Sequence, residues 1–365
     1  MNKISIITLL VAIGVYLFSP LALAVRAQGL DTIEGEVIEV LEEKQIETSI
    51  GAQPYQKLQV KLTSGSQKDQ KIIIEHGQIP SATTQLYHIG DDVVISVSQD
   101  INGQNHYVIA DFVRRDVLLF LFIIFVVVTV VIGQLKGLTS LLGMIFSFGI
   151  IFSFILPQIM HGANPVVIAI VASIALVPIT FFLSHGINQK TLIAIASTFV
   201  ALLITGILAT IFIDAAKLTG FASEEAAFLQ VAAGGTIPIK GLLLAGIIIG
   251  CLGILDDITV SQAAVVAQLK QVNAKLSPWQ LYRQAMVVGQ DHIASMVNTL
   301  ILVYTGAALP LLLLFTTNPQ PFAQVINYEL LADEIIRTLV GSIGLILAVP
   351  ITTFLAVNIA FSKRR

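Results

Sequence analysis

Charged residues and cysteine are both scarce in this chain. Charged residues make up 12% of its 365 residues, whereas a soluble domain carries roughly 25%. The formal net charge is only −3, and the terminal Lys363-Arg364-Arg365 is the one basic run, so no nucleic-acid partner is expected. The single cysteine, Cys251, lies inside an apolar run, which excludes disulfides within the chain and multi-cysteine metal sites. Any chemistry must therefore depend on a few polar side chains in apolar surroundings.

Sequence motifs of the common hydrolases and nucleotide-binding proteins are also missing. The chain has no HExxH, no GxSxG and no GxxxxGK[ST], so nothing indicates metalloprotease or serine hydrolase activity, or ATP-driven transport by this chain alone. Intramembrane aspartyl proteases pair two aspartates, but Gly253-Ile254-Leu255-Asp256 has a hydrophobic residue where their GxGD element has its second glycine. An intramembrane enzyme is therefore the weakest functional hypothesis, and no cofactor is expected.

Long apolar runs dominate the rest of the sequence. Hydrophobic residues make up 55% of the chain, and its mean hydropathy is +0.87. Because a transmembrane helix needs about 20 predominantly apolar residues, residues 114–365 are predicted to form an all-α membrane helix bundle in contact with the lipid bilayer. Seven transmembrane helices are predicted, near residues 117–133, 138–157, 165–184, 190–213, 240–258, 294–316 and 338–361.

Residues 1–27 have the pattern of a signal peptide. Lys3 precedes an apolar run, and the small residues Ala22, Ala24 and Ala27 are suitable cleavage positions. The alternative is an uncleaved N-terminal membrane helix, since the run is long enough to span a bilayer.

Residues 28–113 are predicted to form a small extracytoplasmic β domain. Apolar and polar residues alternate over about five short stretches, and Asn102-Gly103 is a strong hairpin signal. That number of strands is typical of an OB-like or SH3-like barrel. The stretch lacks the basic groove and stacked aromatics of a nucleic-acid binder, so we expect a docking or gating module with a protein partner. Its histidines follow no metal-ligand spacing.

Basic residues predict the orientation of the bundle. With the β domain outside, more lysine and arginine falls on the inner side, which favours an extracytoplasmic N-terminal domain and a cytoplasmic C-terminus in the plasma membrane. The basic residues on the inner side are Lys136, Lys190, Lys270, Lys275, Arg283, Lys363, Arg364 and Arg365.

The most informative stretch is the helical hairpin predicted for residues 240–310. Its first helix carries Gly246, Gly250, Gly253, Asp257 and Ser261 at steps of three and four, which places them on one helical face. Glycines on that face are predicted to let another helix approach closely, so that the acid lies in the seam between helices.

The second helix of the hairpin repeats this spacing with Asp291, Ser295 and Asn298. The predicted spans place Asp257 and Asp291 at the inner ends of their helices, where water can reach them. Ser277-Pro278 predicts a separate interfacial helix that turns into the sixth span.

Oxygen-rich side chains in this hairpin are candidates for binding a hard cation or relaying protons. A histidine beside an acid can also titrate near neutral pH or join a metal site of unknown type. The predicted ion- or substrate-binding residues are Asp256, Asp257, Ser261, Gln262, Gln290, Asp291, His292 and Asn298. The alternative is structural, with the acids making hydrogen bonds that hold the helices together.

The chain resembles the YibE/F-like family of bacterial membrane proteins at these residues. The motifs that carry the resemblance are Gly250-Cys251-Leu252-Gly253-Ile254-Leu255-Asp256-Asp257 with Ser261, Gly289-Gln290-Asp291 with Met296-Val297-Asn298-Thr299-Leu300, and Gly341-Ser342-Ile343-Gly344-Leu345 with Val349-Pro350-Ile351-Thr352. The resemblance implies a multi-pass bacterial membrane protein with an extracytoplasmic front domain, and it implies no activity. Asp256 and His292 fall outside the family pattern.

Three functions remain open from the sequence. The leading hypothesis is an ion- or proton-coupled transporter or permease that moves an inorganic ion or small solute and uses Asp257 and Asp291 for coupling. The second is a non-transporting membrane scaffold whose β domain docks a protein partner. The third is the intramembrane enzyme.

Overall fold

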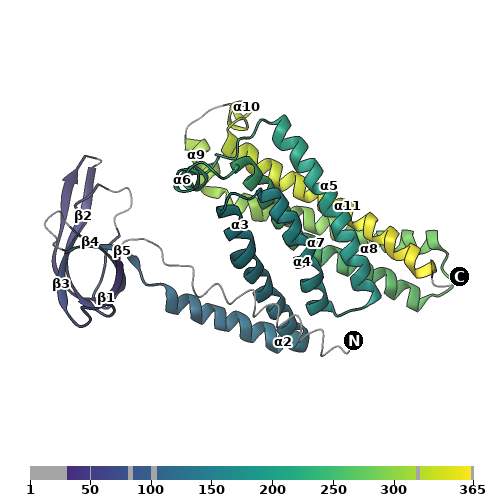
Figure 1. Ribbon diagram of the computed structural model, residues 1–365, viewed down its shortest axis with the longest axis horizontal. Coiled ribbons are helices and arrows are strands. Elements are labelled where there is room, and N and C mark those ends of the chain that lie inside the picture. Colours follow the sequence, from purple (N-terminus) through teal and green to yellow (C-terminus); the bar gives the residue numbers. More distant parts are fainter. Residues whose placement is uncertain (1–30, 50, 81–84, 100–104, 318–320, 363–365) are drawn as a thin grey trace. The chain divides into compact units, whose positions relative to one another are not determined.

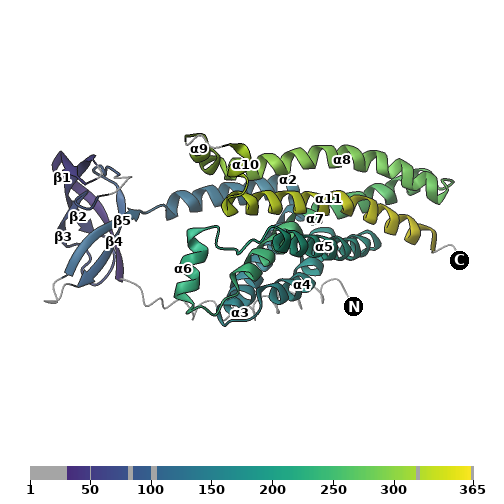
Figure 2. The same cartoon turned by 90° about the horizontal axis from the view of Figure 1, so that it is seen from above.

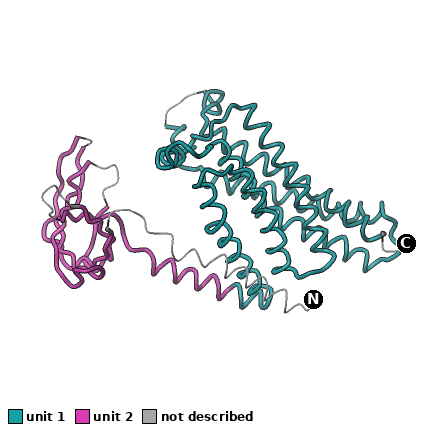
Figure 3. The backbone as a smooth tube through the Cα atoms, viewed as in Figure 1, with its two compact units in different colours: residues 1–24, 129–365 teal, residues 25–128 magenta. Residues whose placement is uncertain are grey.

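The chain forms two compact units, which Figure 3 colours separately. The computed structural model describes residues 31–49, 51–80, 85–99, 105–317 and 321–362. The predicted signal peptide, residues 1–27, lies outside these residues. The first unit ends at Val128, the second continues from Thr129, and each has its own hydrophobic core.

The N-terminal unit contains a five-stranded antiparallel sheet, as the alternating pattern predicts. Its strands are β1 (Asp31–Thr48), β2 (Gly51–Leu62), β3 (Lys71–His76), β4 (Asp92–Gln99) and β5 (Asn105–Phe112), labelled in Figure 1. Their order is β3-β2-β1-β4-β5, so β3 and β5 are the edge strands. β1 is longer than the short stretches predicted, because it pairs with both β2 and β4. Register shifts after Val37 and Val40 bend it.

Alternation along the strands separates a buried face from a charged one. Val37, Leu58 and Ile95 are completely buried in the core of the sheet. Lys61, which alternates with the buried residues of β2, pairs with Asp69 in the connection to β3, with 2.9 Å between Nζ and Oδ1. Exposed pairs of this kind contribute little, so burial of the apolar face is what stabilises the sheet.

A buried glutamine fastens the segment before β4 to the sheet. The Gln56 Nε2 group donates to the Tyr87 carbonyl at 3.0 Å, and the Tyr87 amide donates to Gln56 Oε1 at 2.8 Å. The Tyr87 ring then packs on Phe112 and, edge to face, on His76. This arrangement covers one end of the core.

The second unit is helical. Its elements, with the first helix that leads into it, are α2 (Arg115–Ile150), the π-helical segment η1 (Ile151–Ile155), α3 (Leu156–Met160), α4 (Pro165–His185), α5 (Gln189–Ala215), α6 (Glu224–Ala232), α7 (Ile239–Val272), α8 (Pro278–Ala307), α9 (Leu309–Thr317), α10 (Phe322–Val325) and α11 (Glu329–Ser362). Among the described residues, six helices are long and apolar enough to cross a membrane, where the sequence predicts seven.

The difference lies in the first apolar segment, Arg115–Met160, which forms one run of helix. Gln134 interrupts it with φ 51° and ψ −134°, at the place where the sequence predicts the first loop. Gly137 lies directly against the Thr129 carbonyl, a contact that a side chain at 137 would block. The chain therefore turns sharply between the two predicted spans without leaving a separate loop.

The predicted elbow before the sixth span is wrong. Ser277 does cap the helix, together with Gln280 in a reciprocal capping box, but α8 then continues unbroken to Ala307. The break comes instead at Ala308, ahead of Pro310, because a proline cannot donate to the helical ladder.

The centre of the helical unit consists of α5, α7 and α11, which pack against one another in all three pairings. Figure 2 shows these three running side by side, with α8 along α11. A hydrogen bond between the Thr198 and Thr259 hydroxyls, 2.9 Å apart, joins α5 to α7. Gly344 on α11 lies against the Thr205 side chain of α5, so the backbones come close there.

Candidate functional site: the α7–α8 hairpin

The α7–α8 hairpin is held in register by one buried amide. Gln262 on α7 is 2% exposed, and its Nε2 group donates to the Ala285 carbonyl of α8 at 3.0 Å and to the Thr353 hydroxyl of α11 at 2.7 Å. Gly289 allows this packing, because a Cβ there would lie 2.5 Å from Val349 Cγ1 and 3.1 Å from Gln262 Nε2. Gln262 was predicted as a ligand, but its side chain instead connects α7 to α8 and α11 by hydrogen bonds.

This register brings the acidic residues of the two helices to one level. Six residues back along α7 from Gln262 lies Asp256, and six residues on along α8 from Ala285 lies Asp291. At about 1.5 Å per residue, both positions are displaced about 9 Å from the same hydrogen bond, in the same direction. Asp256 and Asp257 therefore lie at the height of Gln290 and Asp291.

Asp257 and Asp291 do not lie at helix ends, which corrects the prediction from the sequence. α7 extends to Val272 and has 34 residues, and α8 begins at Pro278 and has 30, so each acid lies near the middle of its helix. The prediction failed because hydropathy locates apolar runs, whereas these helices continue through more polar sequence. The two acids are therefore internal residues of long helices and not terminal ones.

Among the described residues, neither Asp257 nor Asp291 has a hydrogen-bond or ion-pair partner, and both side chains are exposed. Asp256 is partly buried, and its Oδ1 atom is buried without a hydrogen-bond partner. Two aspartates at one level, with no cation paired to them from the described chain, are the most unusual chemical feature of the hairpin.

The remaining predicted ligands do not form a closed site at this level. Gln290 and Asn298 are exposed, and Ser261 and His292 are partly buried. No three His, Cys, Asp or Glu side chains of the described chain gather closely enough to hold a metal ion. A metal site that uses His292 therefore has no support from the geometry.

The glycine face of α7 is open in the described chain. Gly246, Gly250 and Gly253 are exposed, and a Cβ added at any of them would have no atom within 4 Å. The close helix contact predicted for this face is not made by any described helix, so a packing role for these glycines stays a prediction that needs a further partner. The close contacts occur instead at Gly289 and Gly344.

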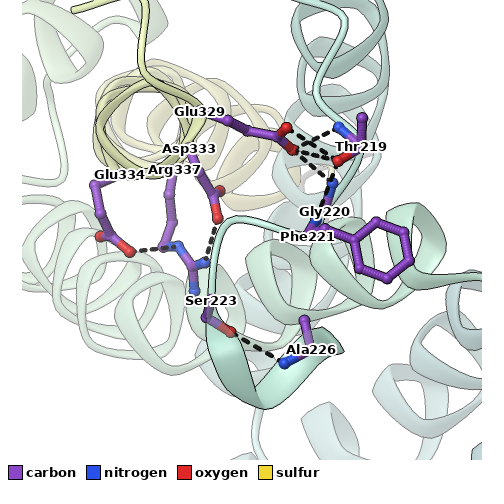
Figure 4. Close-up of polar contacts among 9 residues, drawn as sticks. All are labelled: Thr219, Gly220, Phe221, Ser223, Ala226, Glu329, Asp333, Glu334 and Arg337. Carbon is purple, nitrogen blue, oxygen red and sulfur yellow. Dashed lines mark hydrogen bonds and ion pairs between the residues drawn. The ribbon is translucent and has the colours of Figure 1, made fainter. Parts of the chain in front are cut away.

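A polar cluster that the sequence did not predict lies at the other end of α11 (Figure 4). Glu329 accepts hydrogen bonds from the amides of Thr219 and Gly220, at 2.6 and 2.8 Å, and fastens the loop after α5 to the start of α11. Arg337 lies between Asp333, at 3.3 Å, and Glu334, at 3.7 Å. Glu329, Asp333 and Arg337 are spaced four residues apart, so the sequence alone would have predicted that they share one face of a helix.

These features define a multi-pass helical membrane protein with an N-terminal β-sheet unit. Within that class, the profile of the YibE/F-like protein family matches residues 121–362, and the chain belongs to this family. The resemblance noted in the hairpin motifs is thereby confirmed, while the β-sheet unit lies outside the matched range. No curated protein and no solved structure gives a significant match to the chain.

Proposed function

We propose that this protein is an ion- or proton-coupled transporter or permease in which Asp257 and Asp291 bind the coupling ion. The observation that carries the proposal is their placement: two carboxylates at one level, near the middle of adjacent helices, without a cationic partner among the described residues. Ser261 lies one helical turn from Asp257 on α7 and supplies a further oxygen atom, whereas Asn298 lies about two turns along α8 from Asp291, on the side of this level away from Ser261.

The energetic cost of these acids supports a functional role. An ionised aspartate at the centre of a membrane helix costs about 2.5–3.5 kcal/mol on insertion scales. Such a residue persists where a cation, a proton or a water-filled cavity compensates that cost. A purely structural acid would be expected to bond to a neighbouring helix, as Gln262 does.

The proposal includes a topology. Gln134 divides the first apolar segment into two spans, so seven helices cross the plasma membrane of a bacterial cell. The N-terminal unit then lies outside the cell, after a signal sequence in residues 1–27, and the C-terminus is cytoplasmic. Lys136, Lys190 and Lys270 all come to the cytoplasmic side in this arrangement.

The second candidate function is a scaffold that docks a partner through its sheet. The strand order agrees with an OB-like barrel that is open between β3 and β5. A cleft of about 600 Å³ lies between these edges, lined by Ile73 and Glu75 of β3 and by Tyr107 of β5. Unpaired strand edges are suited to adding an extended peptide.

Thermal stability of the purified protein in detergent, across a series of cations and pH values, tests the leading proposal. A bound ion at a hundredfold excess over its dissociation constant stabilises by about 2.7 kcal/mol. We expect one cation, or a change in pH, to stabilise the wild type, and the effect to be lost in both Asp257→Asn and Asp291→Asn. Flux of that ion into reconstituted vesicles then measures transport.

Glu225→Gln is the matched control, because it also removes one negative charge but lies exposed on α6, outside the proposed ion site. It should respond to the ion as the wild type does. If no cation and no pH stabilises the wild type, and both aspartate variants are merely less stable, the transporter proposal fails and the scaffold is favoured.

A further inference from the structure

A second polar site lies in the helical unit, at the end opposite the Glu329 cluster. A cleft of about 620 Å³ opens where α4 ends, α5 begins and the C-terminal parts of α7 and α11 meet. The polar side chains that line it are Lys136, Ser184, His185, Asn188, Gln189, Lys190, Thr191 and Lys270. None of its lining residues belongs to the proposed ion site.

The cleft has charge of one sign. Its three lysines come from three separate elements, Lys136 from α2, Lys190 from α5 and Lys270 from α7, and no acidic residue lines it. Lys136 and Lys190 form no ion pair with any described residue. Asp257 acts electrostatically on His185, as Lys136 does, but it does not line the cleft.

Lys270 is held in place by its surroundings. Its ammonium group donates to the carbonyls of Ala274 and Leu276, at 3.0 and 3.2 Å, and lies 3.8 Å from the centre of the Phe361 ring. The two carbonyls and the aromatic face orient the ammonium group. The cleft therefore keeps a fixed cation on one wall.

The first turn of α5 also lines the cleft. Asn188 caps this 27-residue helix by accepting from the Thr191 amide at 3.1 Å, and its own amide group donates to the His185 carbonyl at 2.9 Å. The partial positive charge of a helix N-terminus favours an anion at this position.

Thr191 gives the independent indication of a ligand. This residue lines the cleft and is only 1% exposed, yet its hydroxyl oxygen has no hydrogen-bond partner. A buried hydroxyl that makes no hydrogen bond is costly, and a native structure rarely leaves one unsatisfied without a reason. An acceptor that reaches this hydroxyl from the cleft would supply the missing partner.

From these observations we propose that the cleft binds a phosphate group. Ammonium groups from Lys136 and Lys190, the Thr191 hydroxyl and the α5 N-terminus match the charge and the acceptor oxygens of a phosphate. The group belongs either to an anionic phospholipid or to a small soluble phosphate. This inference does not depend on the proposed ion transport.

Thermal stability of the full-length protein in detergent distinguishes the two sources. One arm adds inorganic phosphate at an ionic strength matched with sodium chloride, and the other adds phosphatidylglycerol to the micelles, compared with equal phosphatidylcholine. We expect the wild type to be stabilised in at least one arm. Stabilisation by phosphatidylglycerol alone identifies a lipid site, and stabilisation by inorganic phosphate identifies a soluble ligand.

Two variants test whether the response comes from the cleft. The double change Lys136→Gln with Lys190→Gln should weaken the apparent affinity by about tenfold or more. Thr191→Val, which keeps the shape of the side chain and removes the hydroxyl, should weaken it in the same arm.

Lys275→Gln is the matched control, because Lys275 is an exposed lysine at the same end of the bundle that does not line the cleft. It should keep the wild-type response. The proposal is overturned if neither additive stabilises the wild type beyond its comparison, or if the double lysine variant responds as the wild type does.

Discussion

At the scale of single residues, glycines in this protein have two opposite roles. Gly289 and Gly344 lie where side chains of neighbouring helices fill the space that a Cβ would need. Gly246, Gly250 and Gly253 lie on an open face. Spacing along the helix does not distinguish the two groups, because it identifies a face and not what covers that face.

Alanine substitutions should separate the two groups. Gly289→Ala places a methyl group 2.5 Å from Val349 Cγ1, so we expect a loss of about 1–3 kcal/mol from overpacking. Gly253→Ala is the matched control, since no atom lies within 4 Å and alanine favours the helix by about 1 kcal/mol. Thermal unfolding in detergent measures both, and equal losses would contradict the assigned packing.

His76 should make the N-terminal unit sensitive to acid. Burial lowers the pKa of His76 below its ordinary value, and its Nε2 atom is buried without a hydrogen-bond partner beside Tyr87. The unfolded chain then binds more protons than the folded one, so stability is full above the unfolded pKa of about 6.5 and falls as pH drops through the lower folded value.

Hydrogen exchange of β3 in the full-length protein, at pH 7.5 and 5.5, measures this effect. Because amide exchange is base-catalysed and intrinsically slower at the lower pH, the comparison uses protection factors relative to the unfolded chain. We expect a lower protection factor for β3 at pH 5.5 than at pH 7.5 in the wild type and a smaller difference in His76→Gln. His106→Gln is the control, because His106 is an exposed histidine of the same unit. An unchanged difference in His76→Gln would contradict the proposed origin of the acid sensitivity.

At the scale of elements, Gln134 decides how the first apolar segment is divided. Its φ of 51° with ψ of −134° is a conformation that only glycine adopts without strain. Gln134→Gly should therefore stabilise the protein by about 1 kcal/mol or more. Gln158→Gly, at an exposed position within α3, should instead destabilise by about 1 kcal/mol.

Thermal unfolding of both glycine variants in detergent is the measurement. A loss of stability in Gln134→Gly similar to that in Gln158→Gly would show that residue 134 is helical and that the segment does not turn there. The same result would remove the basis for seven spans.

Helix length is the element property that the sequence predicted least well. Apolar runs located all the long helices, but α7 and α8 extend well beyond their predicted ends at the connection between them. Residues such as Gln262 and Lys270 lower the hydropathy of that stretch, but glutamine and lysine have good helix propensity, so the helix continues. The change moves Asp257 from the end of its helix to the middle.

At the scale of the whole molecule, the proposed topology predicts which surfaces reach each side of the membrane. Because Cys251 is the single cysteine, a Cys251→Ala chain can carry one new cysteine at a time. Ser66→Cys in the β unit should react with an impermeant maleimide in intact cells. Ile187→Cys, between α4 and α5, should react only after permeabilisation.

Both tested positions are exposed, so failure to react reports the side of the membrane and not burial. Reaction of Ile187→Cys in intact cells, with Ser66→Cys protected, would invert the topology. Equal reaction of both would contradict a bundle that separates them by a bilayer.

The sequence by itself determined the class of protein, the family, the β-rich unit and the stretch that holds the acidic residues. These properties depend on local composition and on the periodicity of apolar residues, which can be read directly from the sequence. Tertiary structure alone decided that Gln262 makes hydrogen bonds to two other helices, that Asp257 and Asp291 lie at one level, and that the α7 glycine face is open. It also assembled the lysines of α2, α5 and α7 around the unsatisfied Thr191 hydroxyl. The physical reason is that these features depend on contacts between residues far apart in sequence, which periodicity along one helix does not specify.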